Sequence, residues 1–186
     1  PFDYANTRAF AFWTELLNRG CAITAVSGRD WHGEDKECAA VTYLGLEKDG
    51  ESGFEKSAVH ALSAGRSVVT MGPLIEISAA PDYDESQYSA GSKIIPDERA
   101  VQVKLAVKLD FSVRKGKWAL DMKPVTILID SNRGMEAQIN IPYGSQEIIR
   151  VITIRGLKWL RARLYASMDG TEVMAAFTNP VFFRRD

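Results

Sequence analysis

An alternating apolar pattern at residues 101–110 constrains the fold more than any other feature of this sequence. Five apolar residues alternate there with five others: Val101, Val103, Leu105, Val107 and Leu109 with Gln102, Lys104, Ala106, Lys108 and Asp110. Successive side chains of a β-strand point to opposite faces. The pattern therefore predicts a strand with one buried face and one face in water.

Further short strands are expected on both sides of this run. Residues 68–70 and 74–77 precede it, separated from it by a polar loop at 81–99. The strands expected after it cover residues 125–129, 139–141, 148–154, 159–166, 172–177 and 180–183. A helix is also compatible with 159–166, but the alternation of residue types favours a strand. Short strands at this spacing, with a hairpin signal at Asp169-Gly170, predict an antiparallel β-sandwich-like unit.

The first third of the chain has a different pattern. A helix is predicted from Asn6 or Thr7 to Gly20, followed by an apolar run at residues 21–26 that suits a strand covered on both faces. A second apolar stretch at 39–46 and a helix at 52–65 complete an α/β pattern. We therefore predict an α+β chain: the end of an α/β unit at residues 1–70 and a β-rich accessory domain at 71–186.

Composition excludes some classes of partner. The chain has 186 residues and a formal net charge of -1, so it lacks the positive charge with which proteins grip nucleic acid or an anionic membrane. No apolar run reaches the length of a membrane span. Because the chain opens on Pro1 without a signal peptide, we expect an upstream portion to be absent, and cytoplasmic and exported locations both stay open. The two cysteines, Cys21 and Cys38, do not make a disulfide framework.

The segment 27–32 carries the clearest chemical signal. Asp30 and His32 are two residues apart, just beyond the apolar run, and the carboxyl ends of buried strands are where α/β barrels keep their active sites. A carboxylate and an imidazole together suit zinc, manganese or iron. The alternative is structural: Asp30 caps a turn and His32 makes one hydrogen bond.

A set of short motifs resembles the end of the PHP (polymerase and histidinol phosphatase) superfamily. Its helix ends in Leu-Leu-Asn-x-Gly and leads through a strand into Gly-Ser-Asp-x-His. The corresponding residues here are 16–20 and 28–32. Later motifs resemble the CehA/McbA-like branch: Thr42-Tyr43, Ala61-Leu62-Ser63-Ala64-Gly65-Arg66, Thr70-Met71-Gly72-Pro73 and Thr178-Asn179-Pro180. The resemblance covers most of the chain and is firmest from residue 12 to residue 73.

The resemblance implies a PHP-type α/β barrel end and a metal-dependent hydrolase that cleaves a small phosphoester or related substrate. Asp30 and His32 take the positions of metal ligands for a divalent transition metal. Arg29 stands where the family has serine; it can contact a substrate phosphate or carboxylate, or pair with a nearby acidic residue. Because catalytic metals need three or more protein ligands, these two make an incomplete site, completed by an upstream part of the same protein.

Other candidates have simpler interpretations. His60 reads as a packing or surface histidine, and the acidic loop with Asp82, Asp84 and Glu85 lacks the pattern of an EF-hand. Tyr83 and Tyr88 read as solvated side chains. The alternative function is a non-catalytic β-sandwich that binds a partner or dimerises. That function would use exposed aromatics, for which the candidates are Trp118, Trp159 and Tyr165. Whether this chain alone is an enzyme is open, and so is a homo-oligomeric state.

Overall fold

The computed structural model describes residues 4–28, 40–46, 53–97, 100–113, 121–141, 146–168 and 170–184, with backbone alone at 4–5 and 121–124. Most of these residues form antiparallel β-sheet. Two helices, α1 (Tyr4–Asn18) and α2 (Phe54–Ser63), lie in the first third. In the described parts of the chain no helix is long and apolar enough to cross a membrane.

The larger sheet is built around strand β10 (Trp159–Met168). One edge of β10 pairs with β11 (Thr171–Thr178) and then with β12 (Val181–Phe183), and its other edge pairs with β7 (Asp121–Ser131). The outer strands are β8 (Gly134–Ile141) beside β7, β2 (Ser67–Thr70) and β1 (Val41–Leu44) beyond β11, and β5 (Lys93–Ile94) beside β12.

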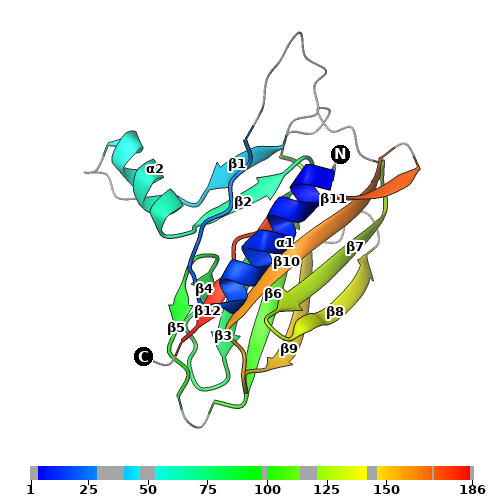
Figure 1. The fold of residues 1–186 in the computed structure, drawn as a ribbon. Coiled ribbons are helices and arrows are strands. Elements are labelled where there is room, and N and C mark those ends of the chain that lie inside the picture. Colours follow the sequence, from blue (N-terminus) through cyan, green and yellow to red (C-terminus); the bar gives the residue numbers. More distant parts are fainter. Residues whose placement is uncertain are drawn as a thin grey trace.

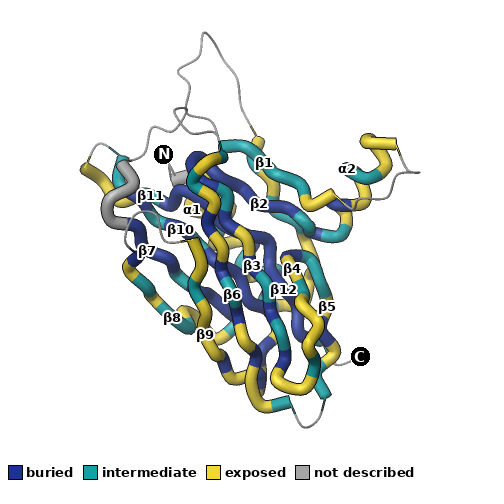
Figure 2. Tube along the Cα trace, turned by 180° about the vertical axis from the view of Figure 1, so that it is seen from behind, coloured by how far each residue is buried: buried dark blue, intermediate teal, exposed yellow. Residues whose placement is uncertain are grey.

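The smaller sheet has four antiparallel strands in the order β4 (Tyr88–Ser89), β3 (Leu74–Pro81), β6 (Gln102–Asp110) and β9 (Glu147–Thr153). Strand β6 is the alternating run of the sequence, and its burial alternates along its length as predicted. Its inward residues pack against those of the larger sheet to form the main core, which includes Val103, Leu105, Ile127 and Leu164. Figure 2 shows the buried and exposed positions alternating along the strands.

Helix α1 forms a third layer across the outer face of the larger sheet (Figure 1). A second apolar cluster joins the two: Trp13 and Leu17 of α1 pack with Trp159, Phe177 and Phe182 of the sheet. The face of β10 that carries Trp159 is therefore buried, and both faces of this strand are covered. This explains why residues 159–166 hold a strand despite their mixed pattern, and it confirms the prediction of a strand there.

The expectation of an α/β barrel end is wrong for the residues that the structure describes. Residues 21–28 run beside the sheets without joining one, and β1 and β2, although α2 lies between them in the chain, pair antiparallel and not parallel as barrel strands do. Of the described strand pairs, β12 with β5 is parallel. The architecture is β-sandwich-like, and its larger sheet includes strands from both sides of residue 70, because β2 pairs with β11. A six-residue apolar run suits a buried strand but does not force one, since its pairing depends on distant residues.

Candidate functional site

The three residues predicted to carry chemistry, Arg29, Asp30 and His32, lie outside the described residues. The structure describes the chain on both sides of them, residues 21–28 before and 40–46 after.

Side chains from distant elements fix residues 21–28. The indole Nε1 of Trp13 donates to the carbonyl of Ile23 at 2.8 Å, and Thr24 Oγ1 donates to the carbonyl of Leu62 at the end of α2, also at 2.8 Å. Each bond joins this segment to a helix. The segment is thus held in an extended path although no β-strand pairs with it.

Asn179 makes the central contact with this segment. Its Oδ1 accepts from the backbone N–H of Ala25 at 2.8 Å, and its Nδ2 donates to the carbonyl of Ala25 at 2.9 Å. The same amide donates to the carbonyl and hydroxyl oxygens of Ser67 on β2. Asn179 is almost fully buried and satisfies a backbone donor and acceptor as a neighbouring strand would. The Thr178-Asn179-Pro180 motif therefore has a structural role here.

Hydrogen bonds join the described residues on the two sides of segment 29–39. The backbone N–H of Ser27 donates to Thr42 Oγ1 at 2.9 Å, and the hydroxyls of Ser27 and Thr42 lie 3.0 Å apart. Thr42 belongs to β1, which pairs with β2 in the larger sheet. The described residues before and after segment 29–39 are therefore held together at the edge of the larger sheet.

The hydrogen bonds of residues 21–28 follow an alternating pattern. The backbones of Cys21, Ile23, Ala25 and Ser27 bond to the body of the protein, whereas Ala22, Thr24 and Val26 have no backbone hydrogen bond to any other part of the chain that the structure describes. Alternation of this kind is typical of a strand with one free edge. Ile23 and Val26 also expose 44% and 53% of their surface.

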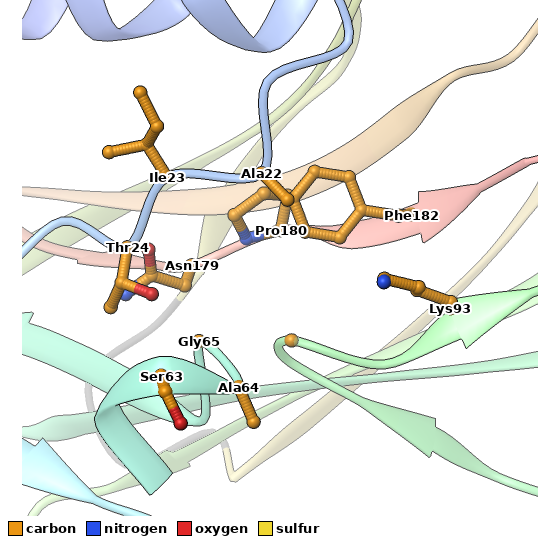
Figure 3. A pocket seen from close by; sticks show the side chains of 11 residues that line it. Ala22, Ile23, Thr24, Ser63, Ala64, Gly65, Lys93, Asn179, Pro180 and Phe182 are labelled. Carbon is orange, nitrogen blue, oxygen red and sulfur yellow. The ribbon is translucent and has the colours of Figure 1, made fainter. Parts of the chain in front are cut away.

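A pocket of about 460 Å³ lies beneath this segment (Figure 3). Residues 22–24 line one side, the end of α2 lines another, and Lys93 provides the charged side chain of its lining. Gly91 closes the wall, with φ of +82°. A Cβ at Gly91 would lie 2.0 Å from the carbonyl oxygen of Ala64, so only glycine fits there. Gly65, with φ of +74°, packs against it.

A buried charged cluster lies under α1, away from this pocket. Asp130 of β7 pairs with two neighbours on β10: Arg161 Nε lies 3.3 Å from Oδ2, and Arg163 contacts both carboxylate oxygens at 2.6 and 2.8 Å. Arg161 is 2% exposed and donates to Thr14 on α1 at 2.9 Å. Its guanidinium carbon lies 4.1 Å from the ring centroid of Phe10.

This cluster holds two cations against one carboxylate. Burial, together with the nearby Arg163 charge, lowers the pKa of Arg161 from its ordinary value to about 10, although Asp130 opposes the shift. Arg161 is therefore still charged at neutral pH. Its Nη1 is buried without a hydrogen-bond partner and is compensated by the aromatic rings of Phe10, Trp13 and Trp159 around it. The cluster joins α1 to the larger sheet.

The remaining candidates from the sequence have structural roles or lie elsewhere. His60 is exposed on α2, with Arg66 Nη2 at 3.3 Å from its Nδ1. Asp82 accepts from the backbone of Gln102, and Asp84 accepts from Ser86 and Tyr88, so both organise their own loop. Hydrogen bonds from Ser86 and Tyr88 lower the pKa of Asp84.

The aromatic candidates do not form an exposed platform in the described part of the chain. Trp159 is fully buried under α1, Tyr165 accepts a hydrogen bond from Arg163, and Trp118 lies outside the described residues. Cys21 is exposed. Over the ranges that the structure covers, no three His, Cys, Asp or Glu side chains gather closely enough to hold a metal ion.

Comparison with known proteins adds no relative. No family model, no curated protein and no solved structure matches this chain.

Proposed function

We propose that this chain is part of a metal-dependent hydrolase and contributes Asp30 and His32 as ligands of a divalent transition metal, with a β-sandwich that holds their loop in place. The observation that carries the proposal is the anchoring of both loop ends through Ser27 and Thr42. A loop with fixed ends loses less conformational entropy when its side chains bind a metal.

The donor chemistry of the loop fits such a metal. Asp30 offers a carboxylate oxygen and His32 an imidazole nitrogen, the ligand types of zinc, manganese and iron sites. A bound divalent metal would activate a water molecule and polarise the ester of a phosphoester substrate. Arg29 precedes the ligand pair, and its guanidinium can bind a phosphate oxygen pair.

The remaining ligands come from a second body that packs on residues 21–28. Three features support this part of the proposal. The run at 21–26 is apolar, its Ile23 and Val26 side chains are exposed, and the backbone groups of Ala22, Thr24 and Val26 make no hydrogen bond to the rest of the described residues. A strand docked at this edge would lie directly before Asp30 and His32. Ligands carried by the second body would then meet them.

The test is paramagnetic broadening by Mn²⁺, which detects even weak binding to an incomplete site. We expect addition of Mn²⁺ to broaden the backbone amide signals of residues 27–33 selectively. The Asp30→Ala/His32→Ala double variant should lose this effect. The matched control is His60→Ala/Glu172→Ala, which removes the other histidine and an exposed carboxylate, and it should broaden as the wild type does. Equal broadening in the wild type and in the Asp30/His32 variant would overturn the proposal.

A further inference from the structure

Strand β9 forms an open edge of the smaller sheet. Among the described strands it pairs with β6 alone. Leu109 N–H donates to Gln146 carbonyl, and Ile154 N–H donates to Val101 carbonyl, so the even-numbered residues of this strand direct their backbone groups toward β6. The N–H and C=O groups of Glu147, Ile149, Val151 and Thr153 therefore point outward along the free edge.

On one face of β9 the central side chains, Ile149 and Val151, are apolar and exposed, and the charged Arg150 lies between them in the chain. Ile149 is 44% exposed and Val151 59%, and both are β-branched. Proteins usually protect an open edge with charged side chains, proline or a short strand. β9 has seven residues and no proline, and it carries apolar residues at the centre of its outward face.

We propose that β9 pairs antiparallel with β9 of a second copy of this chain, across a two-fold axis at Val151. This register sets Val151 opposite itself and Ile149 opposite the partner copy's Thr153. It also sets Glu147, at one end of β9, opposite the partner copy's Arg155. Both charged residues are exposed. Because a two-fold axis repeats every contact, the dimer would contain two ion pairs between Glu147 of one copy and Arg155 of the other.

Charge complementarity selects this register from its neighbours. A two-fold axis at Arg150 would place two arginines directly opposite one another, which is destabilising. An axis at Ile149 would set Glu147 opposite the neutral Val151, and an axis at Thr153 would set Arg155 opposite Val151. The register at Val151 alone matches the two charges while pairing the outward backbone groups of both copies.

Arg150 regulates access to this edge. Its Nη1 donates to the carbonyl of Ile149 at 2.8 Å, and that carbonyl points outward along the edge. The guanidinium thus occupies one acceptor that the partner strand needs. Because Arg150 competes with the partner strand for this carbonyl, its removal should strengthen dimerisation.

The experiment measures molar mass by light scattering over a wide range of protein concentration. The monomer has a mass of 20.6 kDa, and the wild type should approach twice that value as its concentration rises. Val151→Pro removes an outward N–H without touching the pairing to β6, because proline is tolerated where the N–H of an edge strand faces solvent. We expect this variant to stay monomeric. Val59→Lys, which changes an exposed apolar residue on α2, is the control and should dimerise normally.

A charge exchange tests the register itself. Glu147→Arg and Arg155→Glu should each weaken the dimer at least tenfold, and the combined variant should restore it. Arg150→Ala should strengthen the dimer. A wild type that stays monomeric at every concentration, a dimer that survives Val151→Pro, or a charge exchange without rescue would each overturn the proposal. None of these results depends on metal binding, so the proposed function is tested separately.

Discussion

Removal of the Asp130 carboxylate should destabilise the protein strongly. Asp130 is the shared partner of Arg161 and Arg163, whose side chains are 3% and 19% exposed. Asp130→Ala leaves both guanidinium groups without their counter-ion beneath α1. Removal of one partner from a buried ion pair costs about 3–5 kcal/mol. We place Asp130→Ala near the lower end, at about 3 kcal/mol, because Arg163 keeps some contact with water and with Tyr165.

The assay is chemical and thermal unfolding of a small set of variants. For a domain of this size a loss of about 3 kcal/mol corresponds to a fall in Tm of about 6–12 °C. Arg161→Met leaves Asp130 paired with Arg163 and should cost less than Asp130→Ala. The Asp130→Ala/Arg161→Met double variant should lose less stability than the two single variants lose together. The difference, which is the coupling free energy between the two sites, should be about 1–3 kcal/mol. Glu172→Ala, an exposed carboxylate on β11, should change stability by less than about 0.5 kcal/mol.

Two results would refute this account of the cluster. One is a loss below about 1 kcal/mol for Asp130→Ala, which is the range of exposed ion pairs. The other is strict additivity in the double variant, which would mean that Asp130 and Arg161 do not stabilise each other. Either result would mean that α1 is held on the sheet by its aromatic packing and not by the ion pairs.

Three further predictions concern other contacts. Asn179→Ala should cost about 2–4 kcal/mol, because it leaves buried backbone groups unpaired, and should speed amide exchange in residues 21–28 measured by mass spectrometry. Gly91→Ala should give little folded protein in a solubility assay, because its Cβ would meet the carbonyl of Ala64 and its φ is positive. Burial raises the pKa of Glu136. Hydrogen bonds from Arg133 and Ser131, together with the charge of Arg133, outweigh the effect of burial and lower this pKa below its ordinary value of 4.5. Its stabilising contribution should thus be present above pH 4.5 and lost as pH falls through the lowered pKa. Glu136→Gln should therefore match the wild type in acid and be less stable at neutral pH.

The strands could be predicted from sequence because alternation is a local property. The pattern in β6 needs only the pleat of one strand, and the observed burial follows it. The partners of a strand are not local: Val68 of β2 pairs with Thr178, across most of the chain. No pattern within either segment specifies the other, so the sheet order had to come from the structure.

The apolar run at residues 21–26 shows the limit of the same reasoning. Its composition suits a buried strand, yet side chains of Trp13, Asn179 and Thr42 provide the bonds that a neighbouring strand would make. The cluster of Asp130 and Arg161 was also missed, because its members lie on different strands and become buried only when α1 covers them. The alternation of Trp159, Arg161, Arg163 and Tyr165 was the available signal, since it places two arginines on one face with aromatics.

The most direct test of the central claim is the metal content of the protein expressed from its complete natural reading frame and dialysed against metal-free buffer. If Asp30 and His32 are ligands, plasma mass spectrometry should find close to one equivalent or more of zinc, manganese or iron. The Asp30→Ala/His32→Ala variant should lose most of it, and His60→Ala/Glu172→Ala should keep it. Equal metal content in all three proteins, or none in any of them, would contradict the claim and leave the sandwich as a binding or dimerisation module.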